Sequence, residues 1–235
     1  MNTLVIIAGT RPEIIKIAPL ILKAKENSFS KKVNVKLCLT GQHQTMANEA
    51  LSIFGISPDA NLEIMKPNQT LNDISQTVFE RLPKVLDEFS PSVVIVQGDT
   101  TTAAISALCA FNKKIQVAHV EAGLRSFNLD SPFPEEANRK IISTISSYNF
   151  CPTEAAGENL LRESISTNTI HITGNTIVDA LSLISDKEKL NDLFSIHSTI
   201  QKPFVLITAH RRESFGEGFQ NICEAIKECA EKFST

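Results

Sequence analysis

Charged side chains follow three apolar runs of this sequence. The residues are Arg11, Asp99 and Glu121, and the runs span 4–8, 93–97 and 115–120. Near-continuous apolar runs followed by helical patterns are typical of parallel strands that are buried on both faces. Because ligands bind beyond the carboxyl ends of such strands, we expect these residues to converge on one crevice. Carboxylates beside an arginine could there perform acid–base chemistry on an anionic substrate.

The first of these strand ends reads GTRPEIIK, from Gly9 to Lys16. Gly9 permits a tight turn, and the free amides of the next helix could bind a phosphate group together with Arg11. Lys16 lies near the same first turns. The segment matches neither the GxGxxG dinucleotide pattern nor a P-loop. An ordinary strand–helix turn with surface charges explains it equally well.

Most of the other candidates also have a structural alternative. Asp99, or a threonine after it, could cap a helix, which is the commoner role for these residue types. Glu135 could complement the positive end of a helix dipole. Glu121 is harder to explain in this way, since glutamate is a poor cap and stands here at a strand end beside a glycine. His210 begins a His-Arg-Arg triplet suited to a diphosphate, although a lone histidine is more often structural.

Strands and helices alternate along the chain. We predict strands at 4–8, 33–39, 93–97, 115–120, 149–151, 169–173 and 204–208. Helices are predicted to begin near residues 12, 46, 71, 102, 135 and 154, with a last one at 217–233. This alternation predicts an α/β fold with a Rossmann-like parallel sheet. Pro83 lies inside the helix at 71–89 and is expected to kink or divide it.

The pattern divides the chain into three parts. Residues 1–176 form the Rossmann-like domain with the candidate carboxylates, and the charged, leucine-bearing stretch 177–202 connects it to the third part. Residues 203–235, the third part, contain one strand–helix unit. Since a second α/β domain needs several such units to bury its sheet, we expect this part to open a C-terminal domain whose remainder is absent.

Composition excludes several classes of function. A formal net charge of −3, no tryptophan and one tyrosine argue against a nucleic-acid partner. No apolar run approaches the roughly 20 residues of a membrane span, and no signal peptide is evident, which predicts a cytoplasmic protein. The five cysteines form no CxxC pair, so we expect reduced thiols and neither a disulfide framework nor a metal site.

Eight segments together resemble the non-hydrolysing UDP-N-acetylglucosamine 2-epimerases. In family order they are GTRPEIIKIAPL, TGQH, QGDTTT, HVEAGLRS, SPFPEEANR, CPTE, ITGNTIVDAL and ITAHRRESFGEGF, and they cover essentially the whole chain. The resemblance implies two Rossmann-like domains in the glycosyltransferase-B arrangement, with a UDP-sugar between them, and a homodimer. It implies no cofactor: neither a nicotinamide nor a metal performs the chemistry.

The resemblance also implies a mechanism. UDP leaves UDP-GlcNAc as a base removes the C2 proton, and UDP then adds back to the 2-acetamidoglucal with reprotonation on the opposite face, giving UDP-ManNAc. By motif match, the acid–base residues are Asp99, Glu121 and Glu135. The diphosphate-binding and UDP-stabilising residues are Arg11, Lys16 and His210. Which carboxylate takes the C2 proton stays open.

Details within the motifs favour one subtype. The GDTTT segment favours the reversible over the hydrolysing enzymes, and HRRESF in place of HREEN favours UDP-GlcNAc over other UDP-sugars. The family continues with a uridine-binding region that this sequence lacks, so we expect the 235-residue chain alone to be inactive and poorly soluble. The alternatives are an epimerase of a related UDP-sugar, a glycosyltransferase of the same fold, and a non-catalytic truncated product.

Overall fold

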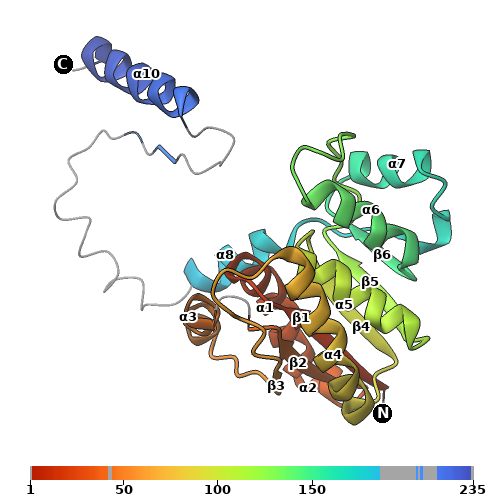
Figure 1. Ribbon diagram of the computed structural model, residues 1–235. Helices are drawn as coiled ribbons and strands as arrows, with labels where there is room; N and C mark the ends of the chain where they lie inside the picture. Colours follow the sequence, from red (N-terminus) through yellow and green to blue (C-terminus); the bar gives the residue numbers. More distant parts are fainter. Residues whose placement is uncertain (1, 42–43, 186–204, 206, 209–215, 234–235) are drawn as a thin grey trace. The chain divides into compact units, whose positions relative to one another are not determined.

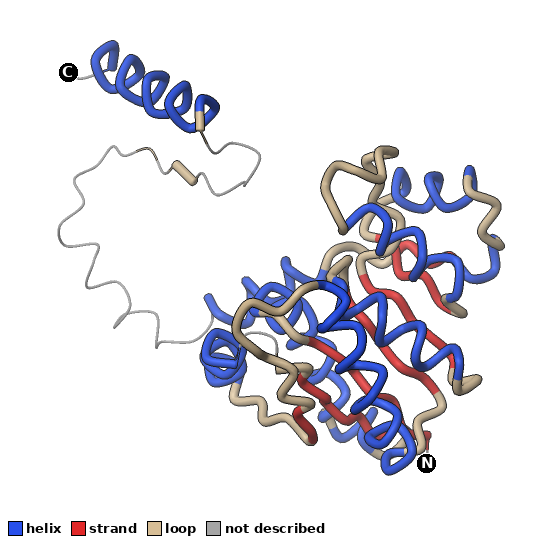
Figure 2. Tube along the Cα trace, in the orientation of Figure 1, coloured by secondary structure: helices blue, strands red, loops and turns tan. Residues whose placement is uncertain are grey.

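A computed structural model describes residues 2–41, 44–185, 205, 207–208 and 216–233, and the chain divides into two compact units, residues 1–188 and 189–235. The first unit contains a seven-stranded sheet (Figure 1 and Figure 2). Its strands are β1 (Asn2–Ala8), β2 (Val33–Leu39), β3 (Ala60–Asn61), β4 (Val93–Gln97), β5 (Gln116–Val120), β6 (Tyr148–Cys151) and β7 (Ile170–Ile172). The predicted parallel sheet is confirmed, and short β3 is an addition to it.

The helices of the first unit match the predicted alternation. They are α1 (Arg11–Lys25), α2 (Asn27–Ser30), α3 (Gln44–Phe54), α4 (Leu71–Phe89), α5 (Thr101–Asn112), α6 (Glu135–Ile145), α7 (Glu154–Arg162) and α8 (Thr176–Ser185), with a 3₁₀ turn at Thr167–Thr169. Polar caps set several of their starts: Thr70, Thr100 and Thr153 each accept a hydrogen bond from a backbone N–H of the first helical turn.

The strand order determines where the candidate site lies. The order is β3-β2-β1-β4-β5-β6-β7, and every neighbouring pair is parallel. The chain winds outward in one direction through β2 and β3, then in the other from β4 to β7, so the order reverses between β1 and β4. Such a reversal point is where doubly wound sheets bind ligands, beyond the carboxyl ends of the strands.

Helices cover both faces of the sheet and bury an apolar core on each. One core joins β1, β4 and β5 to α4, α5 and α6, and the other joins β1 and β2 to α1, α3 and α8. A smaller cluster under α7 includes Ala122, Cys151, Ala156 and Leu160. These buried layers hold the strand ends rigidly, which matters because the candidate residues of this unit lie at or near them.

Pro83 lies inside one continuous helix, α4, so it does not divide this helix, and the alternative that it kinks the helix stays a prediction. Proline removes one backbone donor and crowds the preceding turn. Here Val78, Leu82 and Leu86 on the same helix are at most 1% exposed and pack in the sheet core. Burial of this apolar face outweighs the loss of one hydrogen bond.

The helix α8 belongs to the first unit by packing. Ala180 is fully buried against the core that includes α1, with Leu183 and Ile184 beside it. The predicted connection 177–202 therefore begins with a helix that packs on the sheet domain. The division into domains as a whole stays a prediction.

The second unit is described for one helix, α10 (Glu217–Phe233), which matches the predicted helix. Of the predicted strand at 204–208, the described residues are Val205, Ile207 and Thr208, and they form no strand. A strand is stabilised by pairing with a neighbour.

All five cysteines are free thiols, of which Cys38, Cys109 and Cys151 are buried. None of the helices in the described part of the chain has both the length and the apolar character that a membrane crossing requires.

Candidate active site

Glu121 is the centre of a polar cluster at the carboxyl ends of β4 and β5. Lys16 on α1 donates to both of its carboxylate oxygens, at 2.8 and 2.6 Å. The side-chain amides of Gln97, at the end of β4, and of Asn175, before α8, also donate to it. Only 13% of the Glu121 side chain is exposed. Side chains from three other segments thus converge at this carboxylate.

The backbone at Glu121 is unusual. Its φ of 68° lies in the left-handed region, which residues other than glycine rarely adopt. Such a conformation costs of order 1–3 kcal/mol, is held by the surrounding structure, and is concentrated at functional sites. Just after it, Gly123 has a φ of 86°, and an added Cβ there would lie 2.1 Å from the Ala156 carbonyl oxygen. The turn after β5 therefore presents the Glu121 side chain at a strained, closely packed position.

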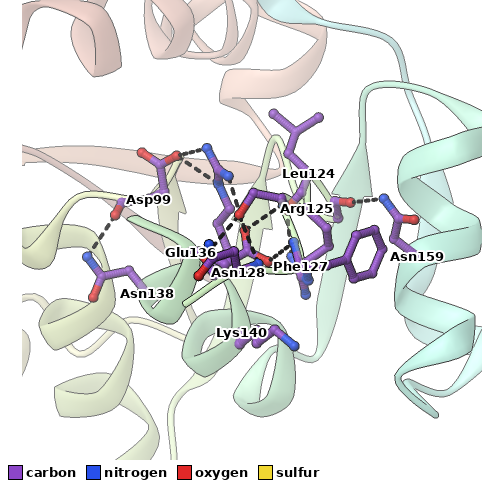
Figure 3. Close-up of polar contacts among 12 residues, drawn as sticks. Asp99, Leu124, Arg125, Phe127, Asn128, Glu136, Asn138, Lys140 and Asn159 are labelled. Atoms are coloured by element: carbon purple, nitrogen blue, oxygen red, sulfur yellow. Dashed lines mark hydrogen bonds and ion pairs between the residues drawn. The ribbon is translucent and has the colours of Figure 1, made fainter. Parts of the chain in front are cut away.

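Asp99 lies just after β4 and is held by α6. The guanidinium of Arg139 donates to one oxygen of Asp99, Oδ2, from Nε at 2.9 Å and from Nη2 at 2.6 Å. Asn138 donates its side-chain amide to the main-chain oxygen of the same aspartate, at 2.8 Å (Figure 3). The N-cap of α5 is Thr100. The helix-cap alternative for Asp99 is therefore excluded, and its carboxylate is available for another role.

The turn after β1 binds a carboxylate of its own chain. Glu13 accepts hydrogen bonds from the backbone N–H groups of Gly9 and Thr10, both at 2.7 Å, and from the Thr100 hydroxyl at 2.6 Å. These two N–H groups precede α1 and already have an acceptor, and the phosphate site expected at the amides of α1 itself stays a prediction. Glu13 is 3% exposed, and burial raises its pKa against the lowering effect of these hydrogen bonds. It ties the turn after β1 to the turn after β4.

The remaining predicted site residues lie at helix starts or outside the described part of the chain. Arg11 is exposed at the first position of α1, and Glu135 is the half-exposed first residue of α6. Among the described residues, the three candidate carboxylates make no hydrogen bond to one another. His210 lies outside the described residues.

A second buried carboxylate, Glu136, holds the loop between β5 and α6. It accepts from the backbone N–H groups of Ser126 and Phe127, at 3.0 and 3.1 Å, and pairs with Arg139 at 3.2 Å (Figure 3). Its side chain has no exposed surface. Burial favours the neutral acid, but the two amides and the guanidinium outweigh it and lower the pKa of Glu136. Glu136 is thus a structural anion next to Glu135.

His119 supports the turn that carries Asp99. Its Nε2 lies 2.7 Å from the Gly98 carbonyl oxygen and donates to it, while Nδ1 has no partner in the described part of the chain. The ring is fully buried, and burial lowers the pKa of His119 to about 4. A neutral imidazole therefore fixes the peptide of Gly98.

Several residues of this site were not singled out from the sequence, namely Gln97, Arg139, Asn138, Glu136 and Asn175. Each lies in a segment that the motifs contain, so a weak signal was present. Gln97 is a polar residue ending an apolar strand, and Arg139 closes the SPFPEEANR segment. Their partners are distant in sequence, and only the fold identifies them.

Known proteins resemble this chain along almost all of its length. The family model described as UDP-N-acetylglucosamine 2-epimerase matches residues 25–235. The UDP-N-acetylglucosamine 2-epimerase of Campylobacter jejuni is 48% identical over 97% of this chain and 61% of its own length, and that of Salmonella typhimurium is 45% identical over 94% of this chain and 60% of its own. The chain thus spans about 60% of the length of these curated relatives.

Solved structures of UDP-GlcNAc 2-epimerases also resemble this chain. The structure of UDP-GlcNAc 2-epimerase from Neisseria meningitidis, bound to UDP-GlcNAc, matches all of this chain with a TM-score of 0.91 and 44% identity, and 64% of that chain is covered. The Methanocaldococcus jannaschii enzyme in complex with UDP-GlcNAc and UDP matches 99% of this chain and 64% of its own, with a TM-score of 0.85 and 38% identity. Together with the family model, these likenesses show that the chain belongs to the UDP-N-acetylglucosamine 2-epimerase family.

Proposed function

We propose that this protein, when it has the full length of its relatives, interconverts UDP-GlcNAc and UDP-ManNAc. The observation that carries the proposal is the arrangement of Glu121 at the strand ends. Its carboxylate accepts hydrogen bonds from Lys16, Gln97 and Asn175, and its backbone is in the left-handed region. A strained and fully oriented carboxylate beside a lysine suits proton transfer on an anionic substrate. The relatives from Neisseria meningitidis and Methanocaldococcus jannaschii, whose structures hold UDP-GlcNAc, support this substrate.

The proposed reaction is an elimination and then an addition. A carboxylate takes the C2 proton, the C2–H electron pair forms the C1–C2 double bond, and the C1–oxygen bond breaks with its electrons leaving on UDP. UDP then adds back to C1 of the 2-acetamidoglucal while an acid delivers a proton to the opposite face of C2. No atom is lost or gained, so no external oxidant or reductant is required.

Each predicted site residue has a role in this scheme. Asp99, Glu121 and Glu135 are the candidate acid–base groups, since one proton must leave and one must arrive on opposite faces. Lys16 and Arg11 are suited to the diphosphate, and Lys16 would exchange its bond to Glu121 for a phosphate oxygen when UDP-sugar binds. His210 is the candidate from the C-terminal part for binding the diphosphate and stabilising the departing UDP. We further propose a cytoplasmic homodimer that supplies ManNAc-type sugars for cell-surface polysaccharide.

The test is proton NMR of UDP-GlcNAc in D2O. One sample contains this chain, and a second contains the chain continued to full length by the C-terminal part of its Campylobacter jejuni relative. We expect only the longer protein to form UDP-ManNAc with deuterium at C2. If neither protein exchanges that proton, the substrate is wrong, and a related UDP-sugar or a non-catalytic product becomes the better interpretation. Turnover by the 235-residue chain alone would contradict its proposed inactivity.

A further inference from the structure

We propose that Arg139 is a positioning residue for the epimerisation and acts through Asp99, an inference that rests on the proposed function. The pair is asymmetric: both guanidinium donors reach the same oxygen, Oδ2, at 2.9 and 2.6 Å. The other oxygen, Oδ1, makes no hydrogen bond within the described residues, and 28% of the Asp99 side chain is exposed. Arg139 therefore leaves one oxygen of Asp99 available to a substrate.

Arg139 is itself immobilised. Its third nitrogen, Nη1, donates to Glu136 at 3.2 Å. The Glu136 carboxylate is fully buried and also accepts from the backbone N–H groups of Ser126 and Phe127. Only 17% of the Arg139 side chain is exposed. Because all three of its nitrogens donate to carboxylates, the Arg139 side chain has little freedom to move. The position of α6 therefore determines the position of the Asp99 carboxylate.

The helix α6 thus holds Asp99 at two points. Asn138 binds its main-chain oxygen and Arg139 binds its carboxylate (Figure 3). Glu135 is the first residue of the same helix. The two candidate carboxylates, 99 and 135, therefore belong to one rigid assembly, which sets how the oxygen of one is placed relative to the other.

Placement matters for this reaction because the two proton transfers occur on opposite faces of one carbon. A misplacement of about 1 Å can reduce a rate about 100-fold. If Arg139 fixes Oδ1 of Asp99, its loss should reduce the chemical step and leave substrate binding almost unchanged. If Arg139 only stabilises the fold, catalysis and binding should decline together with the folded fraction.

The chain offers a matched control. Arg125 also makes a bidentate pair with a carboxylate, donating to Glu163 from Nε at 3.0 Å and from Nη2 at 2.7 Å, and its side chain is fully buried. Arg125 also donates to the Ser143 hydroxyl of α6 and to the Leu124 carbonyl oxygen, and it makes no hydrogen bond to Asp99 among the described residues. Arg125→Gln therefore removes a comparable ion pair near the same helix without releasing the aspartate.

The experiment uses the full-length version of the protein with UDP-GlcNAc as the probe, and measures kcat, KM and deuterium incorporation at C2. We expect Arg139→Gln to lower kcat about 100-fold with KM changed less than about threefold. Arg139→Lys should recover part of the loss, because its ammonium restores a charge and a donor near Oδ2. Arg125→Gln should lower the urea midpoint at least as much and keep kcat within about threefold of the wild type.

A double variant tests whether Arg139 acts through Asp99. We expect Asp99→Asn combined with Arg139→Gln to have the kcat of Asp99→Asn alone, since residues that act as a unit are not additive. Additive losses, or equal losses in the 139 and 125 variants, would overturn the positioning role. Inactivity of the wild-type long protein would instead overturn the proposed function, and the inference with it.

Discussion

Lys16 and Glu121 form a bidentate ion pair across a sequence separation of 105 residues, with Nζ of the lysine 2.8 and 2.6 Å from the two carboxylate oxygens. The pair connects α1 to the end of β5, on opposite sides of the β1–β4 reversal point. A lysine that is 24% exposed beside a carboxylate that is 13% exposed is only partly screened by water. This pair places a cation and a carboxylate at the strand ends, where doubly wound sheets bind their ligands.

We expect Glu121→Gln to remove most activity from the full-length protein. Glutamine keeps an acceptor for Lys16 and fits the same space, so the fold should be retained, but it cannot take a proton. The expected loss in kcat is about 10²–10⁴-fold, measured as deuterium incorporation at C2 of UDP-GlcNAc. Glu158→Gln, at an exposed position of α7, should leave the rate unchanged. Normal exchange by the Glu121→Gln variant would exclude Glu121 as an acid–base residue.

The buried Glu13 allows a test of how the two turns are joined. In Glu13→Ala, the N–H groups of Gly9 and Thr10 and the Thr100 hydroxyl lose their common acceptor. We expect the free energy of unfolding to fall by on the order of 3 kcal/mol in urea titrations of the chain. Glu13→Gln should recover most of this, because its oxygen can accept from both amides and its nitrogen can donate to Thr100. The exposed Glu49→Ala is the control, and equal effects of Ala and Gln at position 13 would contradict this account.

His119 makes stability depend on pH. The folded pKa is about 4, below the ordinary value of 6.5. Above pH 6.5 the ring is neutral in both states; as pH falls towards 4, the unfolded chain binds a proton that the folded chain does not. The stability lost over this interval is about 3 kcal/mol, at about 1.4 kcal/mol per pH unit. In urea titrations at pH 7 and pH 4, His119→Gln should therefore lose less stability than the wild type. An identical loss in both proteins would show that His119 is not the group responsible.

Alanine substitutions at two glycines with similar φ angles should lower the free energy of unfolding by different amounts. At Gly123 an added Cβ would lie 2.1 Å from the Ala156 carbonyl oxygen, and φ is 86°. At Gly174 φ is 80°, but no atom of the described residues lies within 4 Å of the added carbon. We expect Gly123→Ala to cost on the order of 3 kcal/mol of unfolding free energy and Gly174→Ala about 1 kcal/mol. Similar urea midpoints for the two variants would refute the close approach of α7 to the turn after β5.

The sequence by itself determined most of the fold. Apolar runs and helical spacings are local signals, so β2 (Val33–Leu39), α4 (Leu71–Phe89) and α10 (Glu217–Phe233) were each predicted with their observed bounds. Short β3 was not predicted, because two residues carry no periodicity. The segments shared with the epimerases identified the family, and they indicated Lys16 and Glu121 as candidate site residues, which the structure brings into contact.

Only the tertiary structure decided which side chains meet. Strand order brings Gln97 to Glu121, and α6 brings Arg139 to Asp99, across 24 and 40 residues of sequence. It also shows that Thr100, and not Asp99, caps α5, and that Glu13 accepts from the N–H groups of Gly9 and Thr10 in the turn before α1. Local periodicity predicts where a strand ends. The partner of a buried charge is set by which strand ends become neighbours when the sheet closes its core, and no local pattern encodes that choice.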